Sequence, residues 1–82
     1  MKVFLIVAIL GEIVASVGPL PRDMRECWVH ANKRQEATVK AIEQHWAVGI
    51  RHTWEGHTVT PQNVANVCLK SNKRPVLGEP WR

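Results

Sequence analysis

Tyrosine is absent from this 82-residue sequence, and phenylalanine, methionine and cysteine occur only once or twice each. The sequence also has no glycine-rich phosphate loop and no pair of carboxylates arranged for acid–base chemistry. A chain this short has little material with which to enclose a catalytic pocket. These absences predict one small domain that is not an enzyme, with no catalytic residue, metal or other cofactor.

Acidic residues are fewer than basic ones, seven against eleven, which gives a formal net charge of +4 and a pI near 9.6. An excess of positive charge is typical of proteins that contact anions such as nucleic acid. The acids are interspersed among the bases, however, as at Asp23, Glu26, Glu36 and Glu43. Nucleic acid therefore stays open as a partner but is not favoured over a solvated basic surface.

No apolar run has the length of a transmembrane helix, so we expect no membrane span. A span needs about 20 mostly apolar residues, whereas the run from Val3 is interrupted by Gly11-Glu12 and ends at Pro19. A secretory signal peptide is an alternative, because Lys2 precedes the run and Val14-Ala15-Ser16 offers a cleavage site after the serine. In that alternative, the mature protein is secreted without residues 1–16.

A β-hairpin is the interpretation that we favour for the same run. Gly11-Glu12 is a two-residue connection with glycine first, the pattern of a type II′ turn. We expect strands over Val3–Leu10 and Ile13–Gly18, with the first buried on both faces because it is apolar at every position. The β-branched residues that suit a pleated sheet are Val3, Ile6, Val7, Ile9, Ile13, Val14 and Val17.

A long amphipathic helix is predicted from about Arg22 to Val48. Pro21 can open it, and apolar residues then recur with three-four spacing, as at Met24, Cys27, Trp28 and Ala31 and at Val39, Ile42, Trp46 and Ile50. The stretch Asn32–Glu36 is polar throughout, so the helix should be exposed or interrupted there. We expect it to end near Gly49 or Gly56.

The end of the chain is ambiguous between helix and strand. Thr60-Pro61 is a good helix start, but the alternation after Ala65 is typical of a strand. Since a hairpin needs a third strand or a packed helix, we expect an exposed loop over His52–His57 and a strand over Asn66–Ser71. The predicted fold is α+β with β-β-α-β order, a single layer of helix on a short antiparallel sheet. Residues 1–71 form this domain, and residues 72–82 form an extended basic arm.

Cys27 and Cys68 are a candidate disulfide pair, 41 positions apart. In the predicted fold a bridge would join the helix to the last strand, and it would add about 2–4 kcal/mol to the free energy of unfolding. Two buried free thiols are the alternative. Zinc ligation by Cys27 and His30 is not favoured, because their partners would be widely scattered.

Large aromatic and basic side chains are the candidate interface residues. Tryptophan is common where proteins bury contact area, and a basic tail can lie on a neighbouring subunit or contact phosphates. The candidates are Trp28, Trp46, Trp54, Trp81, Lys70, Lys73, Arg74 and Arg82.

Three short motifs resemble small orphan proteins encoded by phages and prophages. They are Val17-Gly18-Pro19-Leu20, the helix opening Asp23-Met24-Arg25-Glu26-Cys27, and Val67-Cys68-Leu69. Such proteins are typically β-β-α-β domains with one cysteine early in the helix and another in the last strand. The resemblance implies a virion component or accessory protein, with other protein subunits as its partners.

A second set of residues is similar to the end of histone-fold proteins. These residues are Thr58-Val59-Thr60, Asn63-Val64 and Arg74-Pro75-Val76-Leu77-Gly78. This resemblance implies helices over Val3–Ser16, Arg22–Trp54 and Thr60–Ser71, together with a dimer partner and a role in chromatin or transcription. It suits the apolar segment Val3–Leu10 poorly, because a helix that is apolar on every side needs cover all round.

Overall fold

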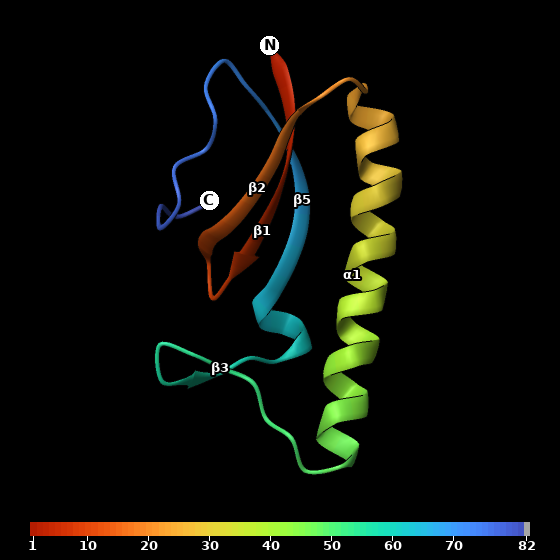
Figure 1. The fold of residues 1–82 in the computed structure, drawn as a ribbon, viewed down its shortest axis with the longest axis vertical. Helices are drawn as coiled ribbons and strands as arrows, with labels where there is room; N and C mark the ends of the chain where they lie inside the picture. The colour runs from red at the N-terminus through yellow and green to blue at the C-terminus, as the bar shows by residue number, and fades with distance from the viewer. Residues whose placement is uncertain (82) are drawn as a thin grey trace.

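The computed structural model describes residues 1–81 and has one long helix packed on a small antiparallel sheet (Figure 1). The predicted α+β class and β-β-α-β order are confirmed. The sheet has the strand order β2-β1-β5. The elements are β1 (Lys2–Ile9), β2 (Glu12–Leu20), α1 (Met24–Ala47), β3 (Thr53–Trp54), β4 (His57–Thr58), the 3-10 turn η1 (Pro61–Asn63) and β5 (Val64–Ser71).

The first hairpin turns one residue earlier than predicted. Ile9 pairs with Glu12, so the central residues are Leu10 and Gly11, with φ of 54° and 81°. Two positive φ values are those of a type I′ turn, whose twist matches that of the flanking strands. The prediction of a type II′ turn at Gly11-Glu12 was wrong because Glu12 already belongs to β2.

The segment predicted as an exposed loop contains a second, smaller hairpin. β3 and β4 pair Thr53 with Thr58 and Trp54 with His57. The residues between them, Glu55 and Gly56, also have positive φ, 49° and 81°. The sequence prediction missed these strands because each is only two residues long.

β1 is the central strand and is covered on both faces, as its apolar sequence predicted. Val3 and Leu5 pack with α1, while Phe4 and Ile6 point to the opposite face and pack against residues of β2, β5 and the C-terminal segment. Figure 1 shows the resulting three layers, with α1 on one side of the sheet and the C-terminal segment on the other. A strand buried in this way holds the two apolar layers together.

α1 is continuous through the polar stretch Asn32–Glu36, where the sequence predicted exposure or an interruption, and its residues there are exposed except for the half-buried Gln35. At its start the carboxylate of Asp23 accepts from the backbone N–H of Glu26 at 2.9 Å, a typical N-cap. In the polar stretch, the amide of Gln35 donates to the carbonyl of Val64 at 2.8 Å and accepts from Asn66 of β5. The polar residues therefore attach the helix to the sheet.

The last strand, β5, runs antiparallel to β1 over its whole length. It begins at Val64, two residues before the predicted start, and Thr60-Pro61 opens only the short turn η1. The helices that the histone-fold resemblance implies over Val3–Ser16 and Thr60–Ser71 are thus strands, apart from η1.

The C-terminal segment, predicted as an extended arm, lies against its own sheet up to Trp81 and turns at Leu77-Gly78. The carbonyl of Ile13 accepts from Gly78 at 2.7 Å, and its N–H donates to Glu79 at 2.9 Å. The N–H of Trp81 donates to the carbonyl of Gly11 at 3.2 Å. The segment covers the face of the sheet that α1 does not reach, over the cluster that contains Phe4.

The predicted disulfide between Cys27 and Cys68 is present, with the two Cα atoms 6.1 Å apart. Both cysteines are buried. The bridge fixes the first turns of α1 to β5, and it belongs to the same apolar cluster as Val3 and Leu5.

Candidate functional site

α1 lies over one side of the sheet rather than over its centre. It packs mainly on β5, touches β1 less and is not a major neighbour of β2. The attachments of α1 to the sheet lead to β5, namely the disulfide from Cys27 to Cys68 and the hydrogen bonds of Arg34 and Gln35 with β5. The half of the same face formed by β1 and β2 is therefore only partly covered.

Two adjoining hollows lie beside α1 on this face, and we call them together the α1–β2 groove. The upper hollow lies between α1, β1 and the end of β2. The lower hollow lies between α1, β1, β5 and residues 52–59 and contains no residue of β2. The upper part of the groove has a volume of about 300 Å³, and the lower part about 520 Å³. Arg34 lines both parts and so marks the middle. The upper part is lined by Leu5, Val17, Leu20, Pro21, Arg22, Cys27, His30 and Arg34. The lower part is lined by Val7, Ile9, Arg34, Thr38, Ala41, Ile42, His45, His52, Thr53, Trp54, Val59, Val64 and Asn66.

The floor of the groove is apolar and partly open to solvent. Val17 of β2 pairs with Leu5 of β1, and cross-strand partners lie on the same face of a sheet. Leu5 is buried under α1, yet Val17 is 48% exposed. The exposed fraction thus rises from β1 to β2, as it should if α1 covers β5 and β1 but not β2.

The polar rim of the groove is basic. Arg22 and His30 line the upper part and His45 and His52 the lower part, and no aspartate or glutamate of residues 1–81 lines either. Nδ1 of His45 lies 2.6 Å from Nε2 of His52, a hydrogen bond that ties the end of α1 to the segment leading into β3. The groove thus combines an apolar floor with the guanidinium groups of Arg22 and Arg34.

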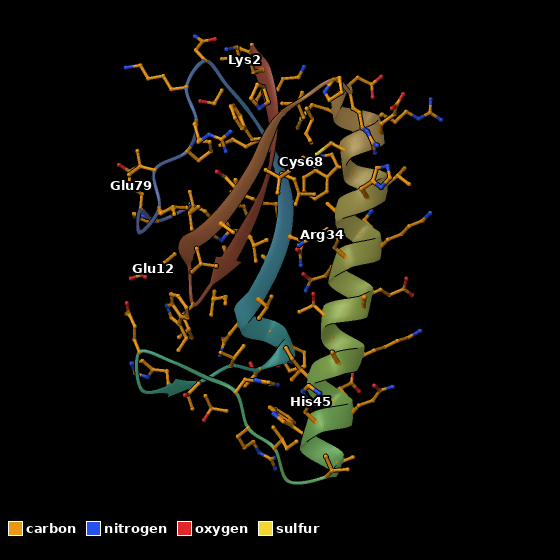
Figure 2. All side chains as sticks on the ribbon, viewed as in Figure 1. Lys2, Glu12, Arg34, His45, Cys68 and Glu79 are labelled. Carbon is orange, nitrogen blue, oxygen red and sulfur yellow. A yellow bond between two sulfur atoms is a disulfide. The ribbon has the colours of Figure 1, made fainter. Side chains whose placement is uncertain are left out.

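Arg34 is held in place at one end and available at the other. Its Nε donates to Oδ1 of Asn66 at 3.4 Å, and Asn66 is itself only 5% exposed and fixed by Gln35. Within the part of the chain that the structure describes, its two terminal guanidinium nitrogens have no partner. Figure 2 shows the side chain between α1 and the sheet. These two nitrogens are available as a donor pair for a carboxylate.

The fold does not bring all the candidate interface tryptophans together on one surface. Trp46 and Trp54 pack on the cluster of Ile42, Val59 and Val64, and only Trp54 lines the groove. Their indole N–H groups are buried, with no acceptor among residues 1–81. Trp28, by contrast, is 38% exposed on α1.

The basic and aromatic residues of the C-terminal segment lie away from the groove. Lys70 and Lys73 are exposed, whereas Arg74 donates to Ser16 and to the carbonyl of Gly18 and lies over the ring of Phe4. Trp81 packs on the cluster that contains Phe4. Arg82 lies outside the described residues.

The sequence prediction missed Arg34, Gln35, Asn66 and Val17 as site residues. The alternation of β5 could have indicated Asn66, because Asn66 shares the buried face of the strand with Val64 and Cys68. A buried amide needs a partner, and the polar stretch of the helix was the available source.

Residues 1–81 contain neither a membrane-spanning helix nor a cluster of metal ligands. No helix there is both long and apolar enough to cross a membrane. No three histidine, cysteine or acidic side chains there come together as a group that could hold a metal ion. The α1–β2 groove is the candidate functional site.

Comparison with known proteins finds no protein-family model, no curated protein and no solved structure that matches this chain.

Proposed function

We propose that this chain is a small non-enzymatic structural or accessory protein, held by contacts with other protein subunits of a larger assembly. The observation that carries the proposal is the α1–β2 groove, in which apolar side chains of the sheet lie uncovered beside α1. Uncovered apolar surface rimmed by polar residues is typical of protein–protein contact sites. Val17 is the clearest example, since it is half exposed opposite the buried Leu5.

The assembly that we propose is a phage particle, with the chain as a virion component. The support is the resemblance of its short motifs to phage and prophage β-β-α-β proteins. The strand and helix order is the one that the resemblance implies. The bridge between Cys27, early in the helix, and Cys68, in the last strand, also has the implied position.

Site-specific photocrosslinking in the producing cells tests the subunit contact. A photoreactive amino acid is placed at Val17 in the groove or, as the control, at Val29, which is 51% exposed on α1 and lines neither part of the groove. We expect a discrete crosslink to another virion protein from Val17 only, in purified particles. Equal crosslinking from both positions, or none from Val17 in particles that contain the chain, would contradict the proposal.

A secreted disulfide-stapled protein is the second candidate, and the disulfide is the observation that favours it. Disulfides persist mainly in oxidising compartments outside the cytosol. In this alternative residues 1–16 are a signal peptide, so cleavage would remove β1 and about half of β2. The intact mass of the natively produced protein separates the two candidates. Loss of residues 1–16 supports secretion, and their retention supports the assembly subunit.

A further inference from the structure

We infer that the α1–β2 groove receives an amphipathic α-helix of a partner subunit, with an acidic side chain of that helix bound to Arg34. This inference rests on the proposed function, because it specifies the kind of partner for the same groove. Three observations support it: the position of α1 on the sheet, the apolar floor beside it and the charge of the rim.

The spacing of the sheet leaves room for one further helix. α1 packs mainly on β5, and β2 is the second strand from β5 in the order β2-β1-β5. Neighbouring strands lie about 4.8 Å apart, so β2 lies about 9.6 Å from β5 across the sheet. The axes of packed helices are roughly 8–10 Å apart. A helix placed beside α1, over β2 in the upper part of the groove and over Val7 and Ile9 of β1 in the lower part, would therefore contact α1 and the sheet together.

The walls of the groove suit a helix with an apolar stripe. On the α1 side, the short side chains of Thr38 and Ala41 line the groove and permit a second helix to approach closely. On the sheet side, Val7, Ile9 and Val17 form an apolar floor. Helices bind such grooves through apolar residues at positions i, i+3 or i+4, and i+7.

The charge of the rim specifies an acidic partner. Arg34 presents two terminal nitrogens at the middle of the groove, and the other ionisable residues that line the groove are Arg22, His30, His45 and His52. A glutamate or aspartate beside the apolar stripe of the incoming helix would complete a charge-assisted pair with Arg34. A second copy that presented the same stripe of α1 would bring two Arg34 side chains together, so the charge favours a different chain.

Binding of designed peptides to the full chain tests this inference. The probe is a synthetic amphipathic helix of about 14 residues, and hence about 21 Å long, with leucines on one side and one glutamate near its centre. Matched peptides carry lysine at that position or the same composition in scrambled order. Titration is followed by NMR of the labelled chain, with shifts expected at Val17, Ile9 and Ala41. The glutamate peptide should bind about tenfold more tightly than the lysine peptide.

Charge reversal assigns that preference to Arg34. Arg34→Glu should abolish or invert the preference for glutamate, so that the lysine peptide binds the variant more tightly. Lys33→Glu makes the same change of charge at the adjacent exposed residue, which lines neither part of the groove, and should leave the preference intact. Thermal unfolding of both variants shows that they are folded before they are compared.

The alternative outcomes overturn the inference and distinguish it from the proposed function. Equal binding of the scrambled peptide, or shifts outside the groove, would contradict a helix in the groove. Tight binding of dodecanoate at the same residues without helix binding would indicate a lipid-like ligand, and concentration-dependent dimerisation blocked by Val17→Asp would indicate a second copy. If no peptide binds but Val17 still crosslinks in particles, the helix inference fails while the proposed function stands.

Discussion

At the scale of single residues, a buried amide pair connects α1 to the sheet. Asn66 donates from its backbone and its side chain to Oε1 of Gln35, at 3.0 and 2.9 Å, and Gln35 in turn donates to Val64. The sequence shows both residues as polar interruptions of apolar patterns, but it does not show that they face each other. Their pairing depends on the register between two elements that lie about 30 positions apart.

Gln35→Ala should therefore destabilise the protein far more than a surface substitution. Removing the amide leaves buried groups of Asn66 and Val64 without partners, and we expect a loss of about 2–4 kcal/mol in the free energy of unfolding. The matched control is Gln44→Ala on the exposed side of α1. This variant should change the free energy of unfolding by less than about 0.5 kcal/mol. Urea unfolding monitored by circular dichroism measures both, and similar effects would contradict a structural role for Gln35.

Gly18 is the second residue whose identity the fold requires. Its φ is +140°, and a Cβ there would lie 2.9 Å from Cδ1 of Phe4 and 3.0 Å from the carbonyl oxygen of Val3. Gly18→Ala should lower the free energy of unfolding by about 2–4 kcal/mol, because the added methyl group combines steric overlap with backbone strain.

Gly78→Ala separates these two contributions to the cost at Gly18. Gly78 also has positive φ, +89°, but no atom lies within 4 Å of the position that a Cβ would take. Gly78→Ala should lower the free energy of unfolding by only about 1 kcal/mol in the same measurement. Equal costs for the two variants would mean that contact with Phe4 and Val3 is unimportant.

At the scale of the elements, the sequence predicted most of the fold. The apolar run from Val3, the three-four spacing after Pro21 and the alternation after Ala65 gave the two first strands, the helix and the last strand. The turn at Leu10-Gly11 was misplaced by one residue, because a leucine with positive φ is uncommon. The course of the C-terminal segment was also missed, since its contacts with β2 lie more than 60 positions away along the chain.

The disulfide should make a measurable contribution to the pairing of α1 with β5. Cross-linking residues 41 positions apart restricts the unfolded chain, which corresponds to about 4 kcal/mol in the free energy of unfolding. The midpoint of urea unfolding should therefore fall strongly when the bridge is reduced. Alkylation followed by mass spectrometry should find no reactive thiol in the folded, unreduced protein. Two alkylated thiols before reduction would contradict the bridge.

At the scale of the whole molecule, the functional interpretation depends on where α1 sits. The sequence predicted one helix on one face of the sheet, but not that the helix covers β5 and leaves β2 partly open. That position follows from the Cys27–Cys68 bridge and from the hydrogen bonds of Arg34 and Gln35 with β5, and of these only the bridge was predicted. Because Arg34 precedes Gln35, the same geometry places a cation in the middle of the groove.

Solvent paramagnetic relaxation tests this central claim most directly, because it measures how open the groove is in solution. With a soluble gadolinium chelate, the methyl signals of Val17 should broaden nearly as much as those of Val29, since the two residues are 48% and 51% exposed. The methyl signals of Val3, which is 7% exposed beneath α1, should broaden little. If Val17 is instead protected to the same degree as Val3 in the isolated chain, the groove is closed and the proposed binding site does not exist.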